Sequence, residues 1–310
     1  MKLALKIDVD TYRGTREGVP RLMDALTKAG AGATFLFSLG PDHTGRAIKR
    51  AFRPGFMSKV SRTSVVKHYG VKTLLYGTLL PGPDIGVKCA ELMRAVKAAG
   101  FEVGIHTWDH VKWQDGVEAA DNAWVEAQMQ QACSRFVEIF GMPARVHGAA
   151  GWQMNRHAFR MTQRLGFAYC SDTRGTHPFV PIVDGEIVAC PQLPTTLPTL
   201  DELIGADMLT PNNVHDHLLQ LTRPAGNTTR DGGGTHVYTL HAELEGMKLT
   251  HVFGRLLEGW RDQGYEIVSM ENLLEAVTVS GLPRHRIEMN GIPGRSGTLA
   301  VQGPLVAAPV

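Results

Sequence analysis

The strongest constraint on the fold is a regular alternation of short apolar segments with amphipathic helical segments along residues 3–276. This alternation is typical of a parallel β-sheet, either open or closed into a barrel. The expected strands are 3–9, 33–39, 101–105, 145–149, 167–170, 187–193, 237–240 and 266–268. The expected helices begin near Pro20 or span 83–99, 121–140, 155–165, 212–221, 250–263 and 270–276. No GxGxxG or GxxxxGK[ST] motif follows the first strand, so a nucleotide-binding sheet loses support and a barrel gains it.

Polar residues recur where the expected strands end. These residues are Asp8, Asp10, His106, His110, Asp172 and His241. The C-terminal ends of parallel strands meet at one face of a barrel, which is where barrel enzymes place their active sites. The sequence therefore predicts that these side chains share one functional site.

Asp10, His106 and His110 form a candidate set of metal ligands. Two histidines four positions apart can turn their rings toward one point if the segment begins a helical turn. That spacing alone is weak evidence for a metal site, because a chain with 13 histidines will contain several such pairs by chance. With a carboxylate, the pair would suit a divalent metal such as zinc and leave room for water and a substrate oxygen. The same ligand set also serves iron(II) oxygenases, so it does not by itself select hydrolysis.

Asp8 and His241 favour hydrolysis over the oxygenase alternative. Asp8 could accept a proton from an activated water, while His241 could donate one to a leaving amine. An acid and a base on opposite sides of an acyl group predict an amidase or deacylase. The simpler alternatives are a structural carboxylate at Asp8 and an ion pair between His241 and Glu243.

Two segments depart from the alternation within the expected single domain, residues 1–278. Residues 43–83 contain no acidic residue and intersperse lysines and arginines with apolar side chains. This composition fits helices lying on an anionic membrane surface, or a covering subdomain whose charges are only solvated. Residues 279–310 are rich in Gly and Pro and are expected to form an irregular tail.

The overall composition limits the partners and the location. A net charge of +2 provides no global field for nucleic acid, so we expect no nucleic-acid partner. Lys6 interrupts the apolar N-terminal run, which argues against a secretory signal. No apolar run approaches the roughly 18 residues that span a bilayer. We therefore expect no transmembrane helix.

Five short motifs resemble those of the polysaccharide deacetylase (NodB-homology) family, in the same order. They are Ile7-Asp8-Val9-Asp10, His106-Thr107-Trp108-Asp109-His110, Gly148-Ala149-Ala150-Gly151-Trp152, Ser171-Asp172 and Thr239-Leu240-His241. Segments 8–15, 38–42, 171–175, 177–179, 196–199 and 241–246 are more narrowly similar to deformylases that act on formamido-arabinose phospholipids. The resemblance extends to about Ala276. It implies an α/β fold, a distorted barrel of about seven strands.

The resemblance also implies roles for individual residues. Asp10, His106 and His110 would hold a divalent metal (zinc, manganese, cobalt or nickel), Asp8 would be the base, His241 the acid, Asp172 would orient His241, and Arg13, Trp152 and Arg174 would bind substrate. One position departs from the family pattern: Gln153 stands where an arginine would pair with the base. Arg174 or Arg13 would then have to replace that arginine.

The implied reaction is hydrolysis of the formamide of a 4-amino-arabinose carried on undecaprenyl phosphate. Such an enzyme would act in lipid A modification and polymyxin resistance, as a peripheral protein on the cytoplasmic face of the inner membrane. The basic segment 43–83 would then bring the site to the lipid surface. The alternatives are an N-deacetylase of a peptidoglycan- or chitin-like polymer and a catalytically inactive barrel that binds a lipid headgroup. The missing signal opposes the first, and the complete set of polar residues opposes the second.

Overall fold

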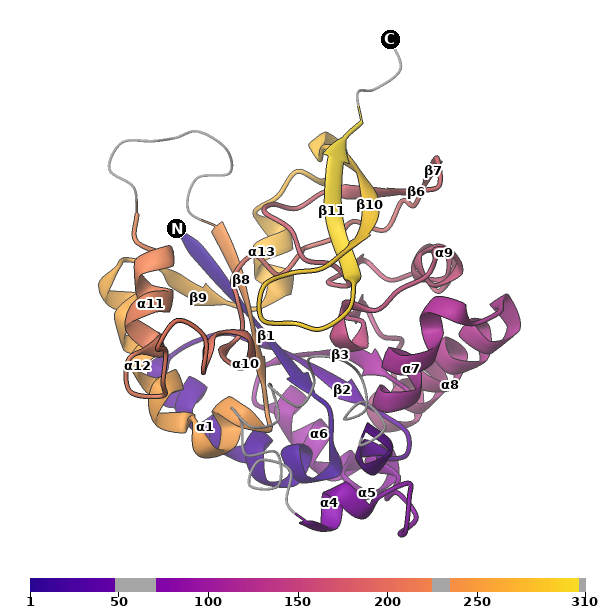
Figure 1. Cartoon of the computed structure of the whole chain (residues 1–310), viewed down its shortest axis with the longest axis horizontal. Coiled ribbons are helices and arrows are strands. Elements are labelled where there is room, and N and C mark those ends of the chain that lie inside the picture. The colour runs from indigo at the N-terminus through magenta and orange to yellow at the C-terminus, as the bar shows by residue number, and fades with distance from the viewer. Residues whose placement is uncertain (48–70, 225–234, 307–310) are drawn as a thin grey trace.

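A seven-stranded parallel sheet forms the centre of the computed structural model, which describes residues 1–47, 71–224 and 235–306 (Figure 1). Its strands are β1 (Lys2–Val9), β2 (Thr34–Ser38), β3 (Glu102–Thr107), β4 (Val146–His147), β5 (Tyr169–Cys170), β8 (Thr235–His241) and β9 (Glu266–Val268). They are ordered β5-β4-β3-β2-β1-β8, and β9 pairs with the first residues of β1. The prediction of an α/β fold with a distorted barrel of about seven strands is confirmed.

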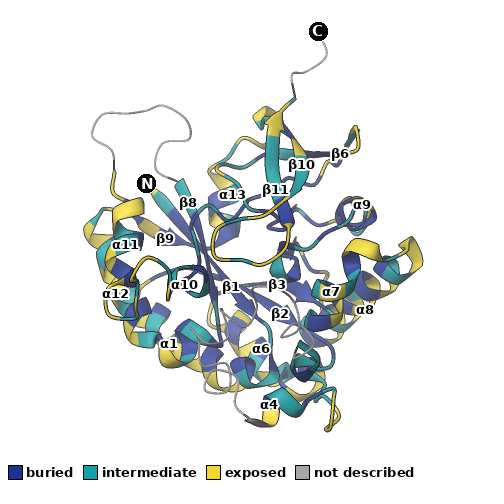
Figure 2. Cartoon of the chain, in the orientation of Figure 1, coloured by how far each residue is buried: buried dark blue, intermediate teal, exposed yellow. Residues whose placement is uncertain are grey.

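Strand β1 pairs with β2, β8 and β9 and is buried on both faces. Seven of its eight residues are buried, and β2 is buried throughout (Figure 2). A strand that is covered on both faces shows a continuous apolar run rather than strict alternation, which is why the sequence pattern identified both strands. Lys6 is the exception, because this charged residue has no exposed surface.

Helices surround the sheet and were largely predicted. They are η1 (Gly14–Gly18), α1 (Val19–Ala29), α4 (Val71–Leu75), α5 (Ile85–Lys88), α6 (Ala90–Ala98), α7 (His110–Gly116), η3 (Val117–Ala119), α8 (Asn122–Phe140), η4 (Ala150–Trp152), α9 (Arg156–Arg164), α10 (Leu200–Leu203), α11 (Val214–Leu221), η5 (Leu244–Lys248), α12 (Thr250–Asp262), α13 (Met270–Glu275) and η6 (Val279–Gly281). Helices α6 and α8 pack on β3, while α12 packs on α1 and β9. Their ends follow ordinary capping rules: Asp121 accepts a hydrogen bond from Trp124 at the start of α8, and Gly30 ends α1 with a φ of 60°.

The C-terminal segment forms a second sheet, so the prediction of an irregular tail at 279–310 was wrong. Strands β10 (Arg284–Asn290) and β11 (Leu299–Leu305) are antiparallel, and β10 also pairs with β6 (Val180–Val183). In Figure 1 the hairpin strands stand at the top of the view beside β6, and the loop that joins them crosses in front of the central sheet. Strand β10 is polar, both strands are only partly buried, and their partner β6 is about a hundred residues earlier. Local periodicity carries little information about such a long-range pairing.

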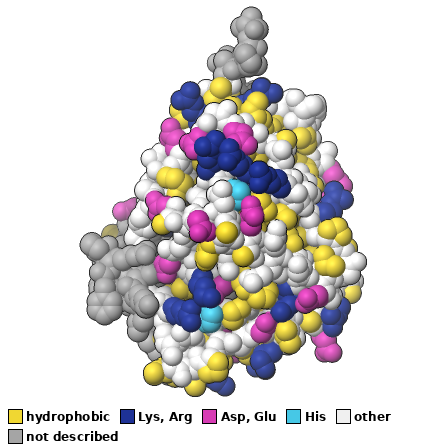
Figure 3. Space-filling view, turned by 90° about the vertical axis from the view of Figure 1, so that its right-hand side faces the viewer, with side chains coloured by type: hydrophobic (Ala, Val, Ile, Leu, Met, Phe, Trp, Pro, Cys, Tyr) yellow, Lys and Arg dark blue, Asp and Glu magenta, His cyan; other side chains and the backbone are white. Residues whose placement is uncertain are grey.

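The strand predicted at 187–193 was also wrong for most of its length. Only β7 (Glu186–Ile187) is a strand there, and it forms an antiparallel hairpin with β6. The turn between them places Asp184 and Gly185 at φ values of 48° and 81°. Arg156 pairs with Asp184, and Arg160 pairs with Glu186. On the face in Figure 3, basic and acidic side chains likewise lie next to one another.

Most of the basic segment predicted at 43–83 lies outside the described residues. Its described ends are joined to each other, because the backbone N–H of Gly45 donates to Tyr76 and Arg46 donates to Gly77. His43 joins them to the barrel through a hydrogen bond with Asp109. Leu79, just after α4, is 81% exposed. In the described part of the chain, no helix is both long enough and apolar enough to cross a membrane.

Candidate active site

The register of the sheet brings the predicted acid and base together. Asp8 of β1 lies opposite His241 of β8 and opposite Leu36 of β2. On the other side, Phe37 of β2 lies opposite Ile105 of β3, which places His106 at the same strand-end level. Parallel pairing therefore brings Asp8, His106 and His241, which are far apart in the sequence, to one face of the sheet, as the sequence predicted.

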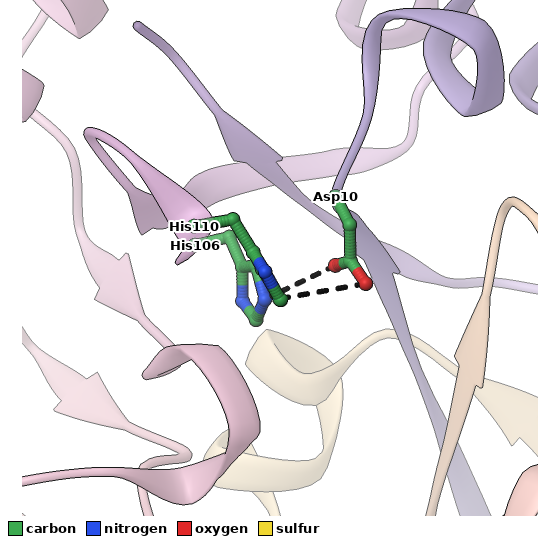
Figure 4. Close-up of side chains that lie close together, drawn as sticks. All are labelled: Asp10, His106 and His110. Atoms are coloured by element: carbon green, nitrogen blue, oxygen red, sulfur yellow. Dashed lines mark ion pairs between the residues drawn. The ribbon is translucent and has the colours of Figure 1, made fainter. Parts of the chain in front are cut away.

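Asp10, His106 and His110 converge at that face (Figure 4). His106 Nε2 lies 3.2 Å from Asp10 Oδ1, and His110 Nε2 lies 3.5 Å from Asp10 Oδ2. The two imidazole rings are 5.2 Å apart. His110 is the first residue of α7, and Asp109 caps that helix by accepting a hydrogen bond from Lys112. His106 lies in β3, so a strand-to-helix bend, rather than the helical turn considered from the spacing, brings the two rings together.

The charges in this group stabilise one another. Burial would raise the pKa of Asp10, but the neighbouring His110 and His106 outweigh it and hold that pKa well below its ordinary value. For His106, burial favours the neutral ring, but Asp8 and Asp10 raise its pKa above the ordinary value. The site thus keeps a carboxylate ionised among imidazoles.

The three residues fit a divalent metal ion. The Nδ1–H of His106 donates to the Gly148 carbonyl at 2.6 Å, so Nε2 is the nitrogen that faces Asp10 and would bind a metal. A second hydrogen bond of this kind commonly fixes metal-binding histidines. The buried atom Asp10 Oδ1 has no hydrogen-bond partner, although buried polar atoms usually have one. Two imidazoles and one carboxylate are also ligand types that zinc and related metals accept.

Lys6 is the cation beside the predicted base. Its Nζ lies 3.4 Å from Asp8 Oδ2 and donates to the Ser171 carbonyl at 3.0 Å. Asp8 is 2% exposed, and its buried Oδ1 has no hydrogen-bond partner. The carboxylate is therefore paired with Lys6 through Oδ2, while its Oδ1 lies 3.6 Å from His106 Nδ1.

Asp172 does not orient His241, contrary to the prediction. Its Oδ1 accepts from His147 Nδ1 at 2.7 Å and from the Ala149 N–H at 2.9 Å, and its Oδ2 accepts from Gln192. Burial would raise the pKa of Asp172, but His147 outweighs it and lowers that pKa. His147 was overlooked. It ends β4, which pairs directly with β5, and Asp172 follows β5 by two residues.

His241 is instead surrounded by Glu245 and Asp201. The backbone N–H of His241 donates to Glu245 Oε2 at 3.0 Å, and the His241 Nδ1 lies 3.9 Å from Asp201 Oδ1. Glu243, the alternative partner considered from the sequence, accepts from the backbone of Asp10 and Thr11. It therefore supports the segment that carries Asp10.

Trp152 is buried at the base of the site rather than open to solvent. Its ring is approached by Lys6 Nζ at 5.1 Å, Arg174 Cζ at 5.0 Å and Arg295 Cζ at 4.5 Å, within the range of cation–π contacts. Arg174 donates to Glu202 at 2.7 Å. Trp152 and Arg174 thus contact other protein side chains below the site. Their predicted contacts with substrate remain predictions.

The arginine expected at position 153 has no simple substitute. Gln153 Nε2 donates to the Thr298 carbonyl at 2.5 Å, near the start of β11. Arg13 pairs with Glu17 one helical turn away. The expected substitutes, Arg13 and Arg174, therefore have acidic partners of their own, and Lys6 provides the positive charge at Asp8.

Comparisons with known proteins identify the family of this chain. Residues 3–170 match the family model described as polysaccharide deacetylase. A relative from Shewanella sediminis (strain HAW-EB3), named probable 4-deoxy-4-formamido-L-arabinose-phosphoundecaprenol deformylase ArnD, is 36% identical over 98% of this chain and 96% of its own. A relative of the same name from Wigglesworthia glossinidia brevipalpis is 30% identical over 94% of this chain and 99% of its own. The chain therefore belongs to the polysaccharide deacetylase family.

The fold also matches a solved structure. The crystal structure of a putative polysaccharide deacetylase from Mycobacterium smegmatis superposes with a TM-score of 0.59 and 17% identity. The match covers 94% of this chain and 95% of that one. At this identity the similarity establishes the fold alone.

Proposed function

We propose that this protein hydrolyses the formamide of 4-deoxy-4-formamido-L-arabinose-phosphoundecaprenol to the free amine and formate. The observation that carries the proposal is the convergence of Asp10, His106 and His110 beside Asp8 and His241. The curated names of two relatives supply the substrate. Membership of a deacetylase family supports the reaction class, cleavage of an amide.

The chain's own residues provide the proton transfers. Asp10, His106 and His110 would hold a divalent ion, such as zinc, manganese, cobalt or nickel, which polarises the formyl carbonyl and acidifies water. Asp8 accepts a proton from the attacking water through Oδ1, which makes no hydrogen bond, while Lys6 balances its charge. His241 donates a proton to the leaving amine. The product amine becomes cationic, which would reduce the negative charge of lipid A and weaken polymyxin binding.

The substrate's polyprenyl chain requires access from the bilayer. We propose that the protein works at the cytoplasmic face of the inner membrane and that segment 43–83 contacts the lipid. The exposed Leu79 and the basic composition of the segment support this location.

A direct test compares formate release from the formamido-arabinose lipid with acetate release from an N-acetylated sugar polymer. We expect formate release, with little turnover of the polymer. Turnover of the acetylated polymer alone would make the protein a polysaccharide N-deacetylase. Lipid binding without any turnover would support the inactive headgroup-binding alternative.

A further inference from the structure

His241 has a buried ring nitrogen without a hydrogen-bond partner. Its Nδ1 is one of the few such atoms in the described residues, and its side chain is only 15% exposed. A histidine that donates a proton from Nε2 works best when an acceptor holds the Nδ1–H, because that bond fixes the tautomer and stabilises the imidazolium ion. The structure must therefore contain an acceptor that can approach Nδ1.

The nearby carboxylates all have partners, but they differ in whether they approach Nδ1. Both oxygens of Glu245 are engaged, one by the His241 backbone and the other by Tyr238. Asp172 is held by His147 and Gln192. Asp201 is the carboxylate that the described residues place at ion-pair distance from Nδ1, 3.9 Å away. Catalytic hydrogen bonds are often this long before substrate binds and shorten in the reacting complex.

The β10–β11 loop holds Asp201 in that place. Arg295 Nη2 lies 3.5 Å from Asp201 Oδ2, and Arg295 Nε donates to Glu202 at 2.6 Å. Thr199 Oγ1 donates to Asp201 Oδ1 at 2.5 Å. The loop is closely seated on α10: a Cβ at Gly294 would lie 2.5 Å from the Glu202 carbonyl oxygen, and the Gly294 φ is 81°. A substituted residue could not occupy that position without displacing the loop.

We propose that Asp201, held by Arg295 of the C-terminal hairpin, is the positioning residue for His241. This inference rests on the proposed function, in which His241 is the general acid. As the C–N bond breaks, the His241 Nε2 proton moves to the amine nitrogen, while Nδ1–H remains hydrogen-bonded to Asp201. The hairpin is therefore part of the active site.

The main test uses Asp201→Asn with two kinds of substrate. Hydrolysis of the formamide needs a proton for the amine, whereas 4-nitrophenyl acetate releases a stable anion that needs none. We expect kcat for the formamide to fall at least about tenfold, part of the 10²–10⁴-fold that general acid catalysis supplies, with KM unchanged. Ester hydrolysis should remain at the wild-type level. Asp201→Asn should add nothing to His241→Ala, because the two residues act as a unit.

The controls separate positioning from folding. Asp216→Asn disrupts a matched His–Asp contact, with His215 at 3.4 Å, and should change neither activity. Arg295→Ala should reproduce the selective loss on the formamide, and Arg295→Lys should restore part of it. Arg286→Ala, at an exposed position of the same hairpin, should have no effect.

Three outcomes would overturn the proposal: normal formamide turnover by Asp201→Asn, equal loss on both substrates, or full additivity with His241→Ala. If the wild type cleaves only an acetamide, the proposed function fails, and the same comparison on that acetamide still tests Asp201. A test without turnover is also available, because ¹⁵N chemical shifts identify the protonated ring nitrogen of His241. The inference requires a proton on Nδ1 in the wild type and its redistribution in Asp201→Asn. An unchanged spectrum would contradict it.

Discussion

Lys6 has no exposed surface, which is rare for a lysine. Its ammonium group is placed between Asp8, the Ser171 carbonyl and the Trp152 ring. Removing one partner of a buried ion pair leaves the other charge uncompensated, which is more costly than removing both. Lys6 therefore stabilises the folded protein as well as balancing the charge of Asp8.

Lys6→Met should destabilise the protein by about 3 kcal/mol, because Asp8 would remain buried without its cation. Urea unfolding monitored by circular dichroism would measure the loss. The double variant Lys6→Met/Asp8→Asn should recover part of it, since the uncompensated charge is then gone. A double variant less stable than Lys6→Met would contradict the pairing.

Glu245 should make stability fall as pH rises toward neutrality. Burial raises its pKa from 4.5 to about 7. The folded protein then binds a proton that the unfolded chain has released, so this contribution is complete below about pH 4.5 and is lost as pH approaches 7. Between these limits the wild type should lose about 3 kcal/mol relative to Glu245→Gln. A pH-independent difference between the two unfolding curves would refute this.

At the residue scale, the sequence predicted the convergence of Asp10, His106 and His110 better than the contacts around them. Asp10, His106 and His110 lie at strand ends or one turn beyond, where local pattern determines position. Asp172 was misassigned because two histidines, His147 and His241, both end strands, and only the sheet register decides which one it meets. Lys6 could have been noticed in the sequence, because it is a charged residue inside an apolar strand. No comparable pattern marks Asp201 or Arg295.

At the scale of elements, the close packing of β3 against its neighbours determines where His106 lies. A Cβ at Gly104 would lie 2.3 Å from Val146 Cγ1 and 2.7 Å from Leu36 Cδ2. Both neighbours belong to adjacent buried strands and have little room to move.

Gly104→Ala should therefore destabilise the protein by about 1–3 kcal/mol, as overpacked cores do, and reduce activity by displacing His106. Gly254→Ala in α12 is the matched control, because nothing lies within 4 Å of its Cβ position. That change should stabilise the helix by up to about 1 kcal/mol. Thermal unfolding of both variants would check the pair, and equal shifts of both in the same direction would refute the packing argument.

Strands β1 and β2 were predictable because they are buried on both faces and consist of continuous apolar residues. The β10–β11 hairpin was not, because its strands bury few side chains and contain Gly303 and Pro304. Its position depends on contacts with β6 and with Gln153, far away in the sequence. The sequence therefore predicted the barrel but missed the hairpin that carries Arg295.

At the scale of the whole molecule, the proposed membrane contact involves one end of the protein. Helix α4, just before Leu79, and the C-terminal end of β11, which carries Leu305, lie at opposite ends of the view in Figure 1. Both leucines are exposed, at 81% and 64%. Substituting each leucine in turn therefore tests which end of the protein contacts the membrane.

Leu79→Glu should weaken binding to vesicles that contain anionic phospholipid by about tenfold, because inserting one leucine contributes roughly 1.5–3 kcal/mol. Leu305→Glu should bind as the wild type does. Vesicle sedimentation measures both. Equal binding of all three proteins would place the lipid contact elsewhere.

The central claim is that Asp10, His106 and His110 hold the ion on which amide hydrolysis depends. Metal content and formate release should be measured together on wild type, His106→Ala and the exposed-site control His251→Ala. We predict one divalent ion per chain in the wild type and control. In His106→Ala we predict loss of that ion and a fall in formate release of more than about 100-fold. A His106→Ala protein that keeps wild-type activity, or a metal-stripped wild type that does, would contradict the account.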